Sequence, residues 1–388
     1  MINATSRLSA SAYRHIIKPI LFKQNPDSVH ARMLRSGSVV QKLSLVTHLT
    51  NSHLAYKNNA MLGQKLAGID FINPVGLAAG LDKNFEITTM LKAIGFGFME
   101  GGSVTLHECA GNAKPWFYRL PKSKSLVVNV GLANHGIEQV IKRIKSYSDN
   151  LLHDFTLNIS VAKTNSIEAA SDKEAIADYV GSLQAIKTAG VGQMVTLNVS
   201  CPNAYGGEPF TTPDRLGNLL TAVDAVNLDQ PVFIKLPCDL PWKTFHSLLQ
   251  VADNHNITGL TISNLAKDRS AMKLQDKLPD SIKGNLSGKP TWELSNNLIR
   301  QTYEIYADRF IIIGVGGIFT AEDAYVKIKL GASLVELVTG LIFEGPQLIG
   351  EINKGLVELL HRDGFSNISQ AIGVDVKLVT KKRLALNN

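Results

Sequence analysis

Short apolar runs alternate with longer amphipathic segments from residue 73 onward in this 388-residue chain. The runs are rich in β-branched residues and are predicted to be strands at 73–79, 97–104, 155–161, 194–200, 231–236, 259–263, 310–317 and 334–340. The segments between them, such as 174–190 and 291–307, are long enough for helices. Eight such units predict an α/β protein with a parallel (β/α)8 TIM barrel. An open doubly wound sheet is the alternative, but GLAAGLDKN after the first strand matches its G-x-G-x-x-G fingerprint poorly.

Polar residues gather at the carboxyl ends of the predicted strands. In a barrel these ends meet at one rim, where active sites of this fold are built. We therefore expect a single site containing Lys83, Ser103, Asn158, Asn198, Cys201, Asn203, Lys235, Asn264, Gly316, Gly317, Thr339 and Gly340.

Glycines follow the seventh strand in the segment GVGGI, residues 314–318. Because glycine has no Cβ, its backbone N–H groups can approach an anion closely. Together with Val338-Thr339-Gly340 after the eighth strand, the segment predicts a phosphate site of the kind that barrels place after strands seven and eight. A plain tight turn is the alternative, and the phosphate could belong to a substrate or to flavin mononucleotide (FMN).

Two lysines and a group of asparagines indicate the ligand chemistry. Lys83 and Lys235 would ordinarily be surface residues, but two lysines at one rim suit a negatively charged substrate or cofactor ring. Four asparagines on the same rim favour a flat ligand rich in carbonyl and N–H groups, such as a pyrimidine, although single asparagines often only stabilise turns.

Cys201 lies in the segment LNVSCPNAY, between Asn198 and Asn203. It could be an inert buried thiol, but its position predicts a general base, provided that its neighbours lower its pKa toward the working pH. No histidine occurs in this segment, so we favour proton abstraction over covalent catalysis. The other two cysteines, Cys109 and Cys238, are interpreted as structural.

The net charge of +7 resides in the N-terminal segment. Residues 1–60 contain eight Lys/Arg and a single acid, Asp27, so that the remainder of the chain is neutral. Basic residues interleaved with Ile16, Ile17 and Ile20 favour an anionic membrane surface over nucleic acid or a merely solvated face. No apolar run reaches the ~18 to 20 residues that would span a bilayer. An organelle transit peptide over residues 1–17 is an open alternative.

These patterns predict residues 1–60 as a small helical membrane-associating segment and residues 61–388 as the barrel. The three cysteines are far apart and lack metal-ligand spacing, so we expect neither a zinc site nor disulfides, and a reducing compartment.

Several motifs resemble, in order and spacing, the dihydroorotate dehydrogenase family. They are NPVGLAAGLDKN, GNAKPWFYRLP, LNVSCPN, GVGGI and LVTGLIFEGP. Two end segments are similar to those of the membrane-associated, quinone-linked class 2. They are IKPILFKQNPDSVHARML and DGFSNISQAIG. The resemblance implies an FMN-bearing barrel preceded by a helical lobe that lies on the membrane and admits quinone. It also implies a peripheral protein on the cytoplasmic face of a bacterial inner membrane, or on the mitochondrial inner membrane of a eukaryote.

The resemblance carries roles onto matching positions of this chain. The resemblance implies that Cys201 is the base that removes the C5 proton of dihydroorotate. It also implies that hydride passes from C6 to the flavin and that the electrons then go to a quinone. Cofactor contacts fall on Lys83, Asn158, Lys235, Gly288, Gly317, Thr339 and Gly340, and substrate contacts on Asn198, Asn203 and Asn264. From their places at the strand ends we also expect Ser103, Asn198 and Gly316 to contact the cofactor, and Lys83 and Asn129 to contact the substrate.

The chain departs from the family pattern at several places, which include SVAK at 160–163 and AYGGEPF at 204–210. Class 2 members carry serine as the base, whereas SCPN resembles the soluble class 1. Val128 replaces a substrate-binding asparagine, and Asn129 stands one residue late. Trp116 and Val338 replace an arginine and a tyrosine near the quinone path. A flavin oxidoreductase acting on another cyclic imide or dihydropyrimidine, and a flavin-binding membrane protein without turnover, are therefore kept as alternatives.

Overall fold

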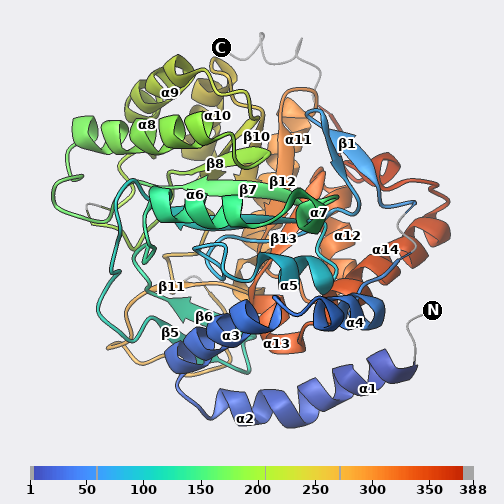
Figure 1. Ribbon diagram of the computed structural model, residues 1–388. Helices are drawn as coiled ribbons and strands as arrows, with labels where there is room; N and C mark the ends of the chain where they lie inside the picture. Colours follow the sequence, from blue (N-terminus) through green and yellow to red (C-terminus); the bar gives the residue numbers. More distant parts are fainter. Residues whose placement is uncertain (1–3, 58–59, 206, 271, 379–388) are drawn as a thin grey trace.

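The computed structural model describes residues 4–57, 60–205, 207–270 and 272–378, and a closed eight-stranded parallel barrel forms its centre (Figure 1). The strand order around the barrel is β10-β12-β13-β3-β4-β7-β8-β9. All eight predicted strands are present, as β3 (Val75–Leu77), β4 (Phe98–Val104), β7 (Thr156–Val161), β8 (Met194–Asn198), β9 (Val232–Leu236), β10 (Gly259–Ile262), β12 (Ile311–Val315) and β13 (Leu334–Leu337). The predicted (β/α)8 barrel is confirmed, and the open doubly wound sheet is wrong.

Helices connect successive barrel strands and cover the outside of the barrel (Figure 1). Apolar residues on their inner faces and on the outward faces of the strands form one large core cluster. The helices are α5 (Thr88–Ala93), α6 (Ile137–Ser146), α7 (Asp149–Leu152), α8 (Asp172–Ala189), α9 (Pro213–Val226), α10 (Trp242–Asp253), α11 (Trp292–Tyr306), α12 (Ala321–Lys329), α13 (Thr339–Glu344) and α14 (Leu348–Asp363).

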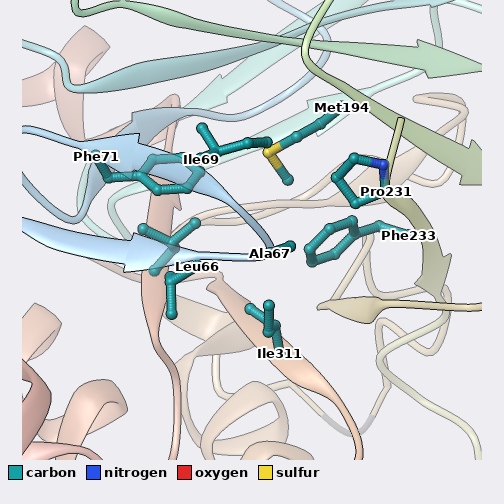
Figure 2. A pocket seen from close by; sticks show the side chains of 9 residues that line it. Leu66, Ala67, Ile69, Phe71, Met194, Pro231, Phe233 and Ile311 are labelled. Atoms are coloured by element: carbon teal, nitrogen blue, oxygen red, sulfur yellow. The ribbon is translucent and has the colours of Figure 1, made fainter. Parts of the chain in front are cut away.

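A short hairpin, β1 (Gln64–Leu66) and β2 (Ile69–Phe71), packs against the amino-terminal end of the barrel. Its Phe71 joins an apolar cluster made by inward-facing residues of five barrel strands, namely Phe98, Met194, Phe233, Ile313 and Leu334. The pocket at this end has only apolar lining (Figure 2). This apolar cluster, called the floor below, closes the amino-terminal end of the barrel. A polar site is therefore expected at the carboxyl end.

A second small sheet lies beside the carboxyl end of the barrel. It pairs β5 (Phe117–Leu120), β6 (Ser125–Val128) and β11 (Asn285–Leu286) in antiparallel fashion. The residues of this sheet come from the loops after β4 and β10. It brings the segment around Val128 next to Asn285, although the two are far apart in sequence.

The N-terminal segment is helical and extends along one edge of the molecule (Figure 1). Its elements are α1 (Ala4–Ala12), a π-helical turn (Tyr13–Ile17), α2 (Lys18–Phe22), α3 (Pro26–Val40) and α4 (Ser44–Leu54). Residues 1–3 and 58–59 of the predicted 1–60 segment lie outside the described residues. Helix is thus present where the sequence predicted it, while the domain boundary itself stays a prediction.

Asp27, the acid of the N-terminal segment, joins this segment to the small sheet. It is buried, and its carboxylate accepts hydrogen bonds from the backbone N–H groups of Trp116 and Phe117 at 3.0–3.2 Å. Arg119 donates to the Phe22 and Gln24 carbonyls at 3.3 and 2.7 Å. The helices are therefore docked by buried polar contacts as well as by apolar packing.

Asp27→Ala is expected to lower the free energy of unfolding by about 1–3 kcal/mol, because two partly buried backbone N–H groups lose their acceptor. Urea unfolding measures this change. The matched control is Asp70→Ala, whose carboxylate side chain is 82% exposed and which we expect to have little effect. Equal stability of the two variants would contradict the docking role of Asp27.

Candidate functional site

A chain of hydrogen bonds joins predicted residues at the carboxyl ends of β4, β8 and β10, and it includes Ser160 of β7. The Asn198 amide donates to Ser103 Oγ at 2.8 Å, and Ser103 Oγ lies 2.9 Å from Ser160 Oγ. The Asn264 amide donates to Asn198 Oδ1 at 3.1 Å. Ser103, Asn198 and Asn264 therefore lie together at one mouth of the barrel, as the sequence predicted.

Lys235 and Asn158 lie deeper, inside the barrel. Lys235 is 4% exposed, and its ammonium group is 3.2 Å from Glu100 Oε1. Asn158 is completely buried and exchanges hydrogen bonds of 2.8 and 3.1 Å with the Thr196 hydroxyl. Lys235 is thus no surface lysine, and the hydrogen-bonding groups of Asn158 already have a protein partner.

Lys83 follows β3 in a tight turn. Its ammonium donates to the Gly80 carbonyl at 2.7 Å, while the Gly80 N–H donates to Gly102 O at 2.9 Å. Burial lowers the pKa of Lys83 to about 8, against the opposing effect of the Asp82 and Glu86 carboxylates. An anionic ligand nearby would stabilise the ammonium form and raise this pKa.

The glycine segments after β12 and β13 come together. Gly316 and Gly317 have φ angles of 113° and 72°, which glycine adopts without strain. A Cβ at Gly340 would lie 2.1 Å from the Ile318 carbonyl, and one at Gly288 would lie 2.8 Å from Thr339 Cγ2. These close approaches put Gly288, Gly317, Thr339 and Gly340 in one small region.

Cys201 follows β8 and is partly exposed. Desolvation raises the pKa of its thiol to about 11, and Glu208 raises it further, while a hydrogen bond to the Asn203 backbone and the charges of Lys163 and Lys235 lower it. The condition that neighbours lower this pKa toward the working pH is therefore not met, because the loss of hydration outweighs the Asn203 hydrogen bond and both lysines. The thiol is a base of high pKa, present mainly in its protonated form near neutral pH.

Lys163 ties the loop after Cys201 to the barrel. Its ammonium donates to the Tyr205 carbonyl at 2.7 Å and to the Ala169 carbonyl at 3.3 Å. Burial lowers the pKa of Lys163. This lysine, at the end of the segment SVAK, was not singled out from the sequence.

A network of amides connects this loop to the small sheet. The Asn203 amide donates to the Val128 carbonyl at 3.0 Å and accepts from Asn285 at 2.7 Å. Asn112 donates to Asn129 Oδ1 at 3.1 Å and to the Asn203 carbonyl at 3.0 Å. Asn129 and Asn203 are thus linked through Asn112, a residue that sequence reasoning missed.

The Val128 side chain lies in an apolar cluster between the small sheet and the N-terminal helices. Its other members are Phe22, Leu126, Phe319, Ile342 and Phe343. The Phe22 and Phe343 rings meet edge to face with centroids 5.1 Å apart. An asparagine at position 128 would instead place an amide in this cluster.

The chain matches the family model for dihydroorotate dehydrogenase over residues 61–360. The chain belongs to the dihydroorotate dehydrogenase family. It is 34% identical over 386 residues to a protein of Nostoc punctiforme named dihydroorotate dehydrogenase (quinone), covering 94% of this chain and 98% of the relative. A protein of Acaryochloris marina with the same name is 32% identical over 374 residues, covering 93% and 99%.

Solved structures of the family agree with this assignment. A crystal structure of the Eimeria tenella enzyme in complex with ferulenol has a TM-score of 0.76 and 25% identity, covering 92% of this chain and 98% of that one. The ligand-free Eimeria tenella structure has a TM-score of 0.76 and 26% identity, covering 87% and 99%. The predicted resemblance to the quinone-linked class of dihydroorotate dehydrogenases is confirmed.

The residues that the structure describes contain neither a metal-ligand cluster nor a helix that could span a membrane. Within residues 4–57, 60–205, 207–270 and 272–378, no three His, Cys, Asp or Glu side chains are grouped as metal ligands would be. In the same part of the chain, no helix combines the length and apolar character needed to cross a bilayer.

Proposed function

We propose that this protein oxidises dihydroorotate to orotate, with FMN as cofactor and a quinone as electron acceptor. The observation that carries the proposal is the convergence of Ser103, Asn198 and Asn264 in one hydrogen-bonded chain beside Cys201 and above the buried Lys235. Membership of a family whose relatives are named as quinone-linked dihydroorotate dehydrogenases supports it.

The residues at the barrel mouth fit FMN. Two ammonium groups, Lys83 and Lys235, suit a ring that gains negative charge on reduction. A Cβ at Gly80, which has a φ of 114°, would meet no atom within 4 Å, so open space lies next to the Lys83 turn. In this proposal Gly288, Gly316, Gly317, Thr339 and Gly340 hold the phosphate, and Ser103, Asn158 and Asn198 hold the ring.

Substrate binding and proton transfer fall to the remaining rim residues. Lys83, Asn129, Asn198, Asn203 and Asn264 bind the carbonyl, N–H and carboxylate groups of dihydroorotate, and Cys201 as thiolate takes the proton from C5. The chemistry that FMN supplies when bound is acceptance of hydride from C6 and onward transfer of the electrons. In this proposal the loop that Lys163 holds shields the thiolate from water.

The test is the colour of the purified protein under anaerobic conditions. We expect a yellow protein whose flavin absorbance is bleached by dihydroorotate and restored by a soluble quinone. A yellow protein that dihydroorotate leaves unchanged would contradict the substrate assignment, and a colourless protein that binds no added FMN would contradict the cofactor.

Val128 favours a second candidate, in which the same flavin chemistry acts on another cyclic imide or dihydropyrimidine. Its side chain belongs to the apolar cluster with Phe22 and Phe343, so it offers no hydrogen bond to a substrate. A ligand amide left unpaired there costs about 1–3 kcal/mol.

Val128→Asn separates the two candidates. If dihydroorotate is bound with one group unpaired, the variant should bind it about 5- to 150-fold more tightly, the equivalent of 1–3 kcal/mol. Titration of the flavin spectrum measures this affinity, and Val127→Ala on the opposite face of β6 is the control. Unchanged binding in Val128→Asn, with a free energy of unfolding equal to that of the wild type, would favour the second candidate.

We further propose that residues 1–60 bind a membrane surface peripherally and admit quinone, and that residues 61–388 form the catalytic barrel. Large apolar side chains are exposed along the helices, with Leu8 at 69%, Ile16 at 60%, Ile20 at 56% and Leu45 at 68%. Exposed apolar side chains on basic helices favour the interface of an anionic bilayer. In a bacterium this surface would be the cytoplasmic face of the inner membrane, and in a eukaryote the mitochondrial inner membrane.

A further inference from the structure

A polar layer lies inside the barrel, directly above its apolar floor. Residues two apart on a strand point to the same face, so the positions that follow the floor residues Phe98, Phe233 and Leu334 also point inward. These positions are Glu100, Lys235 and Glu336, and their side chains are at most 5% exposed. Two acids and one lysine therefore occupy the interior, beneath the mouth where the proposed function places the cofactor.

The hydrogen bonds of this cluster are incomplete if both acids are ionised. Lys235 lies 3.2 Å from Glu100 Oε1. Within the described residues, Glu100 Oε2 and both carboxyl oxygens of Glu336 have no hydrogen-bond donor. Two carboxylates facing one ammonium would bury a net negative charge together with three unsatisfied acceptors, which is strongly unfavourable.

One added proton resolves most of this conflict, leaving a single Glu336 oxygen without a donor. A protonated Glu336 has an O–H group that can donate to the free Glu100 oxygen, and the cluster then has no net charge. Burial and the adjacent Glu100 carboxylate raise the pKa of Glu336 well above its ordinary value, while Lys235 opposes the shift. Charge, hydrogen bonding and burial thus favour the same protonation state.

We propose that Glu100 and Glu336 share a single proton beside Lys235, and that either carboxyl group can serve as the counter-ion that holds this lysine in place and charged. Glu336 is therefore a positioning residue that acts on the cofactor site through Lys235. The part of this inference that concerns the cofactor rests on the proposed function, because it requires flavin above Lys235. The shared proton itself does not depend on the proposed function.

Infrared spectroscopy of the flavin-free protein tests the shared proton. At pH 8, where carboxyl groups with ordinary pKa values are ionised, the wild type should show a C=O stretch of a protonated carboxyl that shifts in D2O and is lost in Glu336→Gln. Glu358→Gln, at a side chain that is 64% exposed, is the control and should keep the band. Absence of the band from the wild type, or its persistence in Glu336→Gln and in Glu100→Gln, would overturn the proposal.

The midpoint potential of the bound flavin tests whether either carboxyl group can serve as the counter-ion of Lys235. Glu336→Gln and Glu100→Gln should each leave the potential nearly unchanged, because one carboxylate still neutralises Lys235. The double variant, Glu100→Gln with Glu336→Gln, should bind reduced flavin more tightly than oxidised flavin by a further factor of ten or more. For a two-electron couple this change raises the midpoint potential by about 30 mV or more.

A large upward shift in Glu336→Gln alone would mean that Glu336 is ionised in the wild type and would overturn the proposal, as would an unchanged double variant. If the protein binds no flavin, the proposed function is wrong, but the infrared experiment still tests the shared proton. The two failures are therefore distinguishable.

Discussion

Cys201→Ala is expected to slow reduction of the bound flavin by dihydroorotate about 10²- to 10⁴-fold, the usual contribution of a general base. Cys201 is the titratable side chain in the loop between Asn198 and Asn203, and both amides are held in place by hydrogen bonds. Without the thiolate, the C5 proton has no acceptor among these residues. Anaerobic stopped-flow absorbance measures the rate constant directly.

The pH dependence of the wild-type rate gives an independent check on the same residue. A base acts in its deprotonated form, and the pKa of Cys201 is raised to about 11. The thiolate fraction, and with it the rate constant of flavin reduction, should therefore rise up to tenfold per pH unit from pH 6 to 9 without a plateau. A plateau below pH 8 would contradict this pKa.

Matched variants separate the chemistry from the folding of the site. Cys109→Ser alters a buried thiol outside the loop and should keep the rate, while Cys201→Ser should retain part of it. Both variants and Cys201→Ala should bind FMN as the wild type does. Undiminished flavin reduction in Cys201→Ala would remove the role of base from this residue.

Replacing Ile16 and Ile20 with serine is expected to weaken binding to anionic vesicles about 30- to 700-fold. Their side chains are 60% and 56% exposed and lie one helical turn apart, so they form part of one face. Transfer of two such side chains from water contributes ~2–4 kcal/mol, which corresponds to that change in partitioning. Vesicle sedimentation measures it.

The control for this experiment is Ile167→Ser, which changes a 65% exposed isoleucine in the loop after β7. It should bind vesicles like the wild type. The double variant should reduce its flavin with dihydroorotate normally but lose turnover with a quinone dissolved in the bilayer. Equal vesicle binding by the double variant and the control would contradict the membrane role of the helices.

Strand and rim positions follow from local patterns. The run MVTLNVS became β8 with Asn198 at its end, and FIIIGVGG became β12 with its glycines just beyond the strand. The small sheet of β5, β6 and β11 was not predicted, because its pairing joins Val128 to Asn285 across a long stretch of chain. Glu100 and Glu336 could have been noticed as charged residues within apolar strands, since buried acids nearly always have a partner.

The sequence alone determined the barrel, the rim and the family, because strand periodicity, strand ends and glycine positions are local properties of the chain. Only the tertiary structure decided the protonation chemistry. It buries Cys201 enough to raise its pKa, and it places Glu100, Lys235 and Glu336 from three separate strands in one interior layer. Hydration and the distances between charges set a pKa, and both arise only when distant segments pack together.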